Sequence, residues 1–487
     1  MAGTQATRPR AGIRVLVMIL VLIGAGVGAT LLLTSGGKRD LVPGAGNRSG
    51  TFDPLGYTPR REQQLERQAA AGESHIVYAK SPGGVIATAK RVARYRPIIE
   101  RQAGAGGIDP NVLEGMIFLE SAGRPDVIAG SDPANAAGLG QILAETGQNL
   151  LGMHVNLAAS RRLTKKIAKA HTAKRVRKLE RARRRVDARF DPSKAIAGAV
   201  RYLTIAKTAL HRDDLAVTSY HMGIGNLQDV LHDYAGGGST KGLSYARVYF
   251  DSSPLRHSAA WSLLSRFGDD SSNYYWKVLG AEQIMRLYRT HPAQLERMSA
   301  LQNARASAEE VLHPEGTTPM YTDPSAIARD VAARKLVTLP NDPKRYGFRV
   351  DPLLGQFAAK LHRRRALYRH LRPEALGALI YVAVGTREIG GPATPLSVTS
   401  AVRDEQYQHL VAAANIEATH GYSLHTTGFT FDIRRAYSTH KEALAFQFML
   451  DRLQALNMIA WVREPEAIHV TVSSRARALE PLIQSVH

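Results

Sequence analysis

The spacing of hydrophobic and polar positions divides the chain into three kinds of segment. Val15–Leu33 is an uncharged run of nineteen residues, long enough to cross a bilayer as a helix. From about residue 86 to residue 235, apolar residues recur every three or four positions, which is typical of amphipathic helices. Beyond residue 346, short strand-like runs flank one strong helix, "HKEALAFQFMLDRLQALN". The pattern predicts a multidomain chain with an N-terminal transmembrane helix, a mainly α domain and a C-terminal α+β domain.

Breaks in this pattern set the expected boundaries. Residues 35–85 are rich in Gly, Pro, Ser, Arg and Gln and show little periodicity, as a linker does. Three C-terminal runs are predicted to be strands: "LGALIYVAVG" (376–385), "PLSVTSAVR" (395–403) and "AIHVTVS" (467–473). The expected divisions are a cytoplasmic tail (1–12), a transmembrane anchor (13–34), the linker (35–85), a helical domain (86–245), a helical connecting region (246–345) and the α+β domain (346–487).

The apolar run near the N-terminus is interpreted as an uncleaved signal anchor, because a cleaved signal peptide has a shorter apolar core. Three arginines precede the run, and two arginines and a lysine follow it closely, so flanking charge does not set its orientation. The chain has no cysteine, which excludes disulfides and thiolate chemistry.

The net charge of +22 is concentrated in one segment. Residues 161–190 carry fourteen Lys and Arg against two acids, with apolar residues at helical spacing. We predict a helix or helical hairpin within a basic insertion at 158–189. One interpretation is a solvated helix with one packed stripe. The other is a contact with a polyanion, either anionic wall polymers or lipid headgroups. No aromatic–basic interleaving or zinc-finger spacing indicates nucleic acid.

A single carboxylate stands out in the helical domain. "NVLEGMIFLESAGRPD" places Glu120 at the end of an apolar helical run, beside Leu113, Met116 and Ile117. Burial against apolar side chains raises the pKa of a carboxyl, so that it stays protonated near neutral pH, as a general acid for glycosidic cleavage must. A capping or exposed glutamate is the alternative interpretation.

Four segments in fixed order favour the catalytic interpretation: the Glu120–Ser121 pair, "AAGLGQILAETG" (136–147), "FDPSKAIAGAVRYL" (190–203) and "LAVTSYHMGIGNL" (215–227). In this order they resemble the soluble lytic transglycosylases, a branch of the lysozyme-like superfamily, over about residues 90–235. The resemblance implies a lysozyme-like domain without a cofactor, in which Glu120 is both acid and base and the product is a 1,6-anhydro sugar. Ser121, Gln141 and Tyr220 would contact substrate, and Gly140 and His221 depart from the family pattern.

A second group of residues suggests metal chemistry in the C-terminal domain. In "GYSLHTTGFTFDI", His425 and Asp432 are seven positions apart and would face opposite sides of an unbroken strand, unless "TTG" bends the chain. "REPEAIHVTV" adds His469, with Glu466 three residues before it. Two imidazoles and a carboxylate suit a catalytic zinc that keeps one position open for water. Taken singly, each histidine could instead be a buried structural residue.

"TSAVR", "SLHTTGFTFD" and "EAIH" together resemble the zinc D-Ala-D-Ala carboxypeptidases and the hedgehog-type metallopeptidases, over about residues 350–475. The resemblance implies that His425, Asp432 and His469 bind Zn²⁺ and that Glu466 is the general base. It also implies that Arg403 stabilises the oxyanion and that Ser423 contacts the substrate. Glu464 is close enough in sequence to compete as the base.

Together the two resemblances imply a membrane-anchored enzyme that remodels peptidoglycan outside the cytoplasmic membrane. The helical domain would cut glycan strands, and the C-terminal domain would act on stem peptides as a carboxypeptidase or endopeptidase. Two alternatives stay open. One is a wall-binding scaffold with degenerate enzyme domains, and the other is a lysozyme-type glycoside hydrolase.

Overall fold

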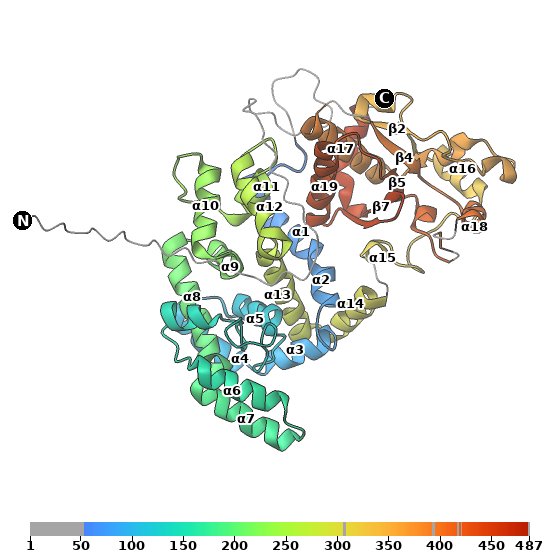
Figure 1. Ribbon diagram of the computed structural model, residues 1–487. Coiled ribbons are helices and arrows are strands. Elements are labelled where there is room, and N and C mark those ends of the chain that lie inside the picture. Colours follow the sequence, from blue (N-terminus) through green and yellow to red (C-terminus); the bar gives the residue numbers. More distant parts are fainter. Residues whose placement is uncertain (1–52, 305–307, 392–394, 416–417, 420, 486–487) are drawn as a thin grey trace, which may run out of the picture.

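The computed structural model describes residues 53–304, 308–391, 395–415, 418–419 and 421–485 (Figure 1). The predicted transmembrane run Val15–Leu33 lies outside these residues. Within the described residues, no helix combines the length and the apolar character that crossing a bilayer requires.

The first part of the chain folds into a helical domain. Its centre is the pair α5 and α13, which pack against each other, while α4 and α9 pack on α8. α5 begins where the Asp109 side chain accepts a hydrogen bond from the Asn111 amide, with Pro110 in its first turn, and it ends at Ala122 in a left-handed conformation. The helices are α1 (Glu62–Gly72), α2 (Ser74–Ala79), α3 (Val85–Ala93), α4 (Arg96–Gly106), α5 (Pro110–Ser121), α6 (Leu157–Ala168), α7 (Ala173–Val186), α8 (Pro192–Leu210), α9 (Asp213–Met222), α10 (Ile224–Ala235), α11 (Tyr245–Asp251), α12 (Ser258–Ser272), α13 (Tyr274–Thr290) and α14 (Pro292–Ala304).

The linker prediction for residues 35–85 is wrong over α1 and α2. Leu65 and Ala69 are fully buried, at the i, i+4 spacing of a packed helix face that the many Arg and Gln residues obscured. α1 also contacts α19 (His440–Ala455) of the C-terminal domain, and a Cβ at Gly72 would lie 2.6 Å from the carbonyl oxygen of Gln454. This segment therefore joins the two domains as packed structure.

The C-terminal domain is built on a five-stranded sheet with the order β2-β4-β5-β7-β6. β2 runs parallel to β4 and the other neighbours are antiparallel. α17 and α19 pack against each other, α17 against β7 and α19 against β6 (Figure 1). The elements are α15 (Glu309–Leu312), α16 (Pro324–Ala332), β1 (Val337–Thr338), β2 (Phe348–Val350), β3 (His370–Leu371), α17 (Pro373–Gly390), β4 (Leu396–Ser400), α18 (Glu405–Ala414), β5 (Thr430–Arg434), α19 (His440–Ala455), β6 (Ile459–Arg463) and β7 (Ala467–Val472).

Two of the three predicted strands are confirmed, as β4 and β7, and the third is wrong. Residues 376–385 lie inside the helix α17, and every one of them is buried. A short, continuous apolar run fits a buried helix as well as a buried strand, so its periodicity could not decide between them. Pro373 in the first turn of α17 favours the helix.

The region 246–345 is not a separate connector. Its α13 belongs to the core of the helical domain, where it packs on α5. Its later part belongs to the sheet domain, because His313 Nε2 donates a hydrogen bond to the carbonyl of Val472 at 2.7 Å and the amide of Tyr321 donates to the carbonyl of Thr426 at 2.8 Å. The C-terminal domain thus begins before the predicted boundary at residue 346.

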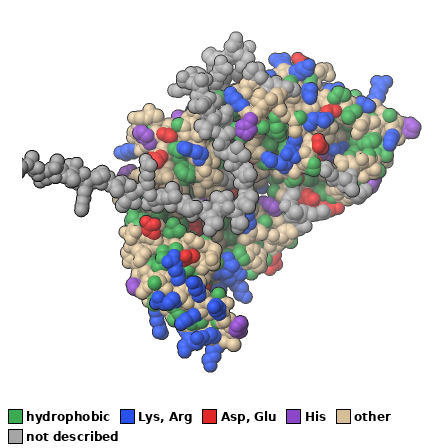
Figure 2. Space-filling model, in the orientation of Figure 1, with side chains coloured by type: hydrophobic (Ala, Val, Ile, Leu, Met, Phe, Trp, Pro, Cys, Tyr) green, Lys and Arg blue, Asp and Glu red, His purple; other side chains and the backbone are tan. Residues whose placement is uncertain are grey.

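The basic segment forms the predicted helical hairpin, α6 and α7, which projects from the helical domain (Figures 1 and 2). Ion pairs gather at its root, where Arg161 pairs with Asp132, and Arg183 and Arg184 pair with Asp126. Ten other cations are exposed and form no ion pair with a described carboxylate. They are Arg162, Lys165, Lys166, Lys169, Lys174, Arg175, Arg177, Lys178, Arg181 and Arg185.

Candidate active sites

The first candidate site is centred on Glu120, in the last turn of α5. The hydroxyl of Tyr274, the first residue of α13, donates a hydrogen bond of 2.6 Å to Glu120 Oε1. The packing of α13 on α5 creates this contact across 154 positions of sequence, so the spacing of residues along the chain gave no sign of it. An aromatic ring at 274 was visible in the sequence, but its partner was not.

Burial raises the pKa of the Glu120 carboxyl to about 7, and the hydrogen bond from Tyr274 limits that rise. Burial, with the nearby charge of Glu120, raises the pKa of Tyr274 well above its usual value, so its hydroxyl keeps the proton that it donates. The predicted elevation of the pKa of Glu120 is therefore present in the structure. Among the described residues, no second carboxylate contributes to that pKa.

Tyr220 lies beside this pair. Its ring stacks on Tyr274 with 6.4 Å between centroids, and its hydroxyl donates a 2.6 Å hydrogen bond to the carbonyl oxygen of Gly140. A Cβ at residue 140 would lie 2.9 Å from that hydroxyl oxygen, so a larger residue there would require the Tyr220 side chain to shift. Tyr220 thus ties the 138–142 loop to the site that holds Glu120.

Two predicted substrate contacts have structural roles here. Ser121 is only 1% exposed, and its hydroxyl donates to the carbonyl of Ile117 at 3.2 Å, so it has no surface to offer a substrate. Gln141 is partly buried, and its amide donates to the carbonyl of Gly138 at 2.9 Å, which fixes the loop. The prediction that Ser121 contacts substrate is corrected, because the end of the helix buries the residue.

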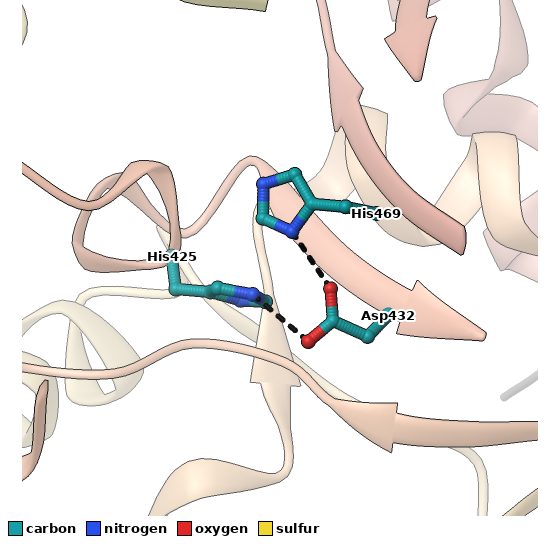
Figure 3. Close-up of side chains that lie close together, drawn as sticks. All are labelled: His425, Asp432 and His469. Carbon is teal, nitrogen blue, oxygen red and sulfur yellow. Dashed lines mark hydrogen bonds and ion pairs between the residues drawn. The ribbon is translucent and has the colours of Figure 1, made fainter. Parts of the chain in front are cut away.

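The second candidate site brings together the three predicted metal ligands (Figure 3). Asp432 on β5 and His469 on β7 are direct cross-strand partners, so both side chains stand on the same face of the sheet. His425 lies on a short 3₁₀ helix, Leu424–Thr427, that ends at Gly428 with φ of 78°. This turn is the predicted bend at "TTG", and it brings His425 over the face that carries Asp432.

The potential ligand atoms of the three residues all lie within 4.8 Å of one another. His425 Nε2 is 3.1 Å from Asp432 Oδ2, and His469 Nδ1 is 2.8 Å from Asp432 Oδ1 (Figure 3). A tetrahedral zinc with ligands at about 2.0–2.1 Å holds neighbouring ligand atoms about 3.3 Å apart. The donor set and its spacing therefore fit such an ion.

The electrostatics of this site favour an ionised carboxylate. Burial alone would raise the pKa of Asp432, but the two imidazoles hold it well below its usual range. Burial, together with the charge of Arg403, lowers the pKa of His425 to about 4. Burial also lowers the pKa of His469, but its hydrogen bond to Asp432 and the nearby carboxylates outweigh this effect and raise it to about 9.

Arg403 joins the site from the loop after β4. Its guanidinium donates to Ser400 Oγ at 2.7 Å and to Asp432 Oδ2 at 3.4 Å. Beside it is a pocket of about 180 Å³, lined in part by Phe357 and Tyr407. Ser423 is 6% exposed and precedes the 3₁₀ helix that carries His425. Arg403 thus lies between the metal-ligand cluster and a pocket.

The two glutamates proposed as alternative bases have different positions. Val462 is the cross-strand partner of His469, and Glu464, two residues further on, shares its face of the β6–β7 hairpin. The charge of Glu464 also raises the pKa of both His469 and Arg403. Glu466 is exposed in the turn, an odd number of residues from His469. Glu464 therefore lies on the same face of the hairpin as His469, whereas Glu466 lies in the exposed turn.

Comparison with known families covers part of the first domain. The model of the Transglycosylase SLT domain matches residues 166–240, from the end of α6 through α10. Residues 166–240 are therefore similar to the SLT domain family. The SLT match contains Tyr220 and excludes Glu120, so the role of Glu120 depends on its geometry. The match ends at residue 240, before the residues of the second site.

Relatives of the SLT segment include proteins named endo-type membrane-bound lytic murein transglycosylase A. Those from Salmonella paratyphi B, Salmonella enteritidis and Salmonella typhimurium are each 35% identical over 69 residues. The alignment covers 14% of this chain and 32% of each relative. The chain thus spans about a third of the length of the relatives that it matches.

Proposed function

We propose that this chain is a peptidoglycan-remodelling enzyme whose helical domain cleaves glycan strands by lytic transglycosylation. The observation that carries the proposal is Glu120, a carboxyl with a pKa raised to about 7 by burial and held by Tyr274. The SLT match and the name of the relatives supply the substrate class.

In the proposed reaction, neutral Glu120 donates its proton to the glycosidic oxygen as the bond from that oxygen to C1 breaks. The resulting carboxylate then takes the proton of the 6-hydroxyl of the same sugar, whose oxygen bonds to C1. This closes the 1,6-anhydro ring, returns Glu120 to its neutral form and consumes no water. Hydrolysis normally uses a second carboxylate as nucleophile or water activator, whereas this reaction needs Glu120 alone. The SLT match and the name of the relatives favour transglycosylation over a lysozyme-type hydrolase.

Digestion of purified peptidoglycan by the full-length chain, with product masses, tests this proposal. We expect anhydro-sugars, which are one water lighter than the products of a hydrolase. Reducing-end products instead would establish the hydrolase alternative. No released product at all would establish the wall-binding scaffold.

We further propose that the sheet domain binds Zn²⁺ through His425, Asp432 and His469 and cleaves stem peptides. The donor set fits zinc, which when bound would acidify a water and polarise a carbonyl. Glu464, on the face of His469, would accept the proton of the attacking water. Arg403, whose guanidinium is fixed by Ser400 and Asp432, would meet the developing oxyanion without reorganising.

The zinc proposal is tested by measuring the metal content of the purified chain and the effect of a chelator on peptidoglycan digestion. We expect about one zinc per chain. Chelation should abolish peptide cleavage and spare glycan cleavage. A metal-free chain that cleaves stem peptides would contradict the metal role.

We propose that the α6–α7 hairpin binds the phosphate groups of anionic wall polymers. Its exposed cations form no ion pair with a described carboxylate, so they are available to an external polyanion. Changing Arg177, Lys178 and Arg181 to Gln should weaken binding to isolated walls several-fold at low salt and reduce its salt dependence.

A matched control changes three exposed cations elsewhere, Arg67, Lys90 and Arg101, which should leave wall binding unchanged. Vesicles of anionic lipid distinguish the two sources of phosphate. Binding to vesicles but not to walls would assign the hairpin to the membrane surface.

We also propose that residues 13–34 anchor the chain in the cell membrane as a single span, with the bulk of the chain outside, since both proposed substrates lie there.

A further inference from the structure

A buried carboxylate from outside the sheet lies next to one of the metal-ligand candidates. Glu309, the first residue of α15, is 5% exposed. Its Oε1 atom lies 3.8 Å from His469 Nε2 and accepts a 3.2 Å hydrogen bond from Thr471 Oγ1. Because α15 packs against β6 and β7, this side chain is held at the edge of the second site.

The two imidazoles of the second site are arranged in the same way. His425 turns Nε2 toward Asp432 and Nδ1 toward the carbonyl of Ala401, at 2.9 Å. His469 turns Nδ1 toward Asp432 and Nε2 toward Glu309. A histidine that binds a metal usually donates its other ring N–H to a carbonyl or carboxylate, which fixes its tautomer and the orientation of the ring. His425 has such an outer partner at hydrogen-bond distance, and Glu309 stands at the corresponding position beside His469.

We propose that Glu309 is a positioning residue for the metal site, which holds the proton on His469 Nε2 and leaves Nδ1 free to bind the ion. This inference rests on the proposed zinc function. The 3.8 Å separation is longer than a direct hydrogen bond, so one water or a small side-chain rotation completes the contact. A residue from the segment before β1 thereby completes the site of the sheet domain.

Further contacts hold the segment around α15 on the sheet. The ring of His313 stacks on Phe429 with 4.2 Å between centroids, and the hydroxyl of Tyr422 donates to the His313 carbonyl at 2.7 Å. These contacts fix the end of α15, and with it Glu309, independently of any ion. The carboxylate is therefore in place before the metal arrives.

The test is a zinc titration of the metal-free, full-length chain in competition with a chromophoric chelator. Glu309→Ala should lower zinc affinity by roughly 10–100-fold, the usual cost of losing an outer partner of a ligating histidine. Glu309→Gln keeps the shape of the side chain but loses its charge. Its loss of zinc affinity should lie near the lower end of that range. Glu315→Gln, an exposed glutamate of the same segment, should bind zinc as the unchanged chain does.

Two further measurements separate positioning from a structural role. In the metal-free state, Glu309→Gln should unfold at the same temperature as the unchanged chain. In the cobalt-loaded state, the visible absorption of Glu309→Gln should be shifted from that of the unchanged chain. Unchanged zinc affinity and cobalt spectrum in Glu309→Gln would overturn the positioning role while the metal site stood. Failure of the unchanged chain to bind zinc would instead overturn the proposed zinc function itself.

Discussion

The two candidate sites hold their central carboxylates in opposite charge states. Burial raises the pKa of Glu120 to about 7, and the Tyr274 hydroxyl donates a hydrogen bond to it. Asp432 is buried, but two imidazoles hold its pKa well below the usual range, and the Arg403 guanidinium forms an ion pair with it. Desolvation acts on both, so the neighbouring charges decide the outcome.

This difference matches the chemistry proposed for each site. A group that must donate a proton to a leaving oxygen has to be neutral near pH 7, whereas a metal ligand has to be ionised. The helical domain supplies an uncharged, aromatic environment, and the sheet domain supplies cations. Changes that alter either environment should therefore affect one reaction and spare the other.

Replacing the helical-domain carboxyl should have the largest effect. Glu120→Gln removes the transferable proton, so we expect glycan cleavage to fall by roughly 10²–10⁴-fold, the usual contribution of general acid–base catalysis. Cleavage of stem peptides should be unchanged. Mass analysis of the digestion products measures both reactions in one sample.

The pH dependence of thermal unfolding is a folding control for Glu120→Gln. Because the folded-state pKa of Glu120 lies above its ordinary value of 4.5, its contribution to stability is full below pH 4.5 and is lost as the pH rises through about 7. Glu120→Gln has no charge to bury, so above pH 7 it should unfold at a higher temperature than the unchanged chain. A lower unfolding temperature at that pH would mean that Glu120 is not desolvated.

Asp432→Asn should produce the reverse selectivity. It removes the charge that both imidazoles share, so zinc affinity should fall by more than the roughly 10–100-fold that loss of an outer partner costs. Peptide cleavage should be lost with it, and glycan cleavage should stay within about twofold, since the two sites share no residue. Parallel loss of both activities would show that the sites are coupled or that the variant misfolds.

Variants of Glu464 and Glu466 test which of the two glutamates is the general base of the sheet domain. Glu464→Gln should lower peptide cleavage by about 10²-fold, because it removes the carboxylate on the face of His469. Glu466→Gln, the matched control two residues away, should have little effect. The opposite ranking would mean that the β6–β7 turn rearranges when substrate binds. Zinc content measured beside activity separates the role of a base from that of a ligand.

The sequence could predict residues whose roles follow from local order. Three such features depend on neighbours within about ten positions, and the structure contains each of them. They are the bend at "TTG", the strand with His469 and the apolar environment of Glu120. The α6–α7 hairpin was predictable for the same reason, since its apolar stripe has helical spacing.

What the sequence could not predict depends on contacts between distant segments. Tyr274 reaches Glu120 because α13 packs on α5, and Glu309 reaches His469 because α15 packs on the sheet. Both came from the region expected to be a connector. The face that carries Glu464 was likewise fixed only by the pairing of β6 with β7. Tertiary packing, which no local pattern encodes, therefore completes both sites.

The variant with the smallest expected effect is Tyr274→Phe, which tests how Tyr274 influences the charge state of Glu120. The hydrogen bond from Tyr274 stabilises the ionised form and lowers the pKa of Glu120, against the larger effect of burial. Tyr274→Phe keeps the ring and removes the bond, so this pKa should rise further. The alkaline limb of the pH profile for glycan cleavage should move to higher pH, with a loss of about tenfold or less at neutral pH. Peptide cleavage serves as the control and should keep its profile. A limb that moved to lower pH would mean that Tyr274 acts mainly by excluding water, and that removing its hydroxyl admits solvent to the carboxylate.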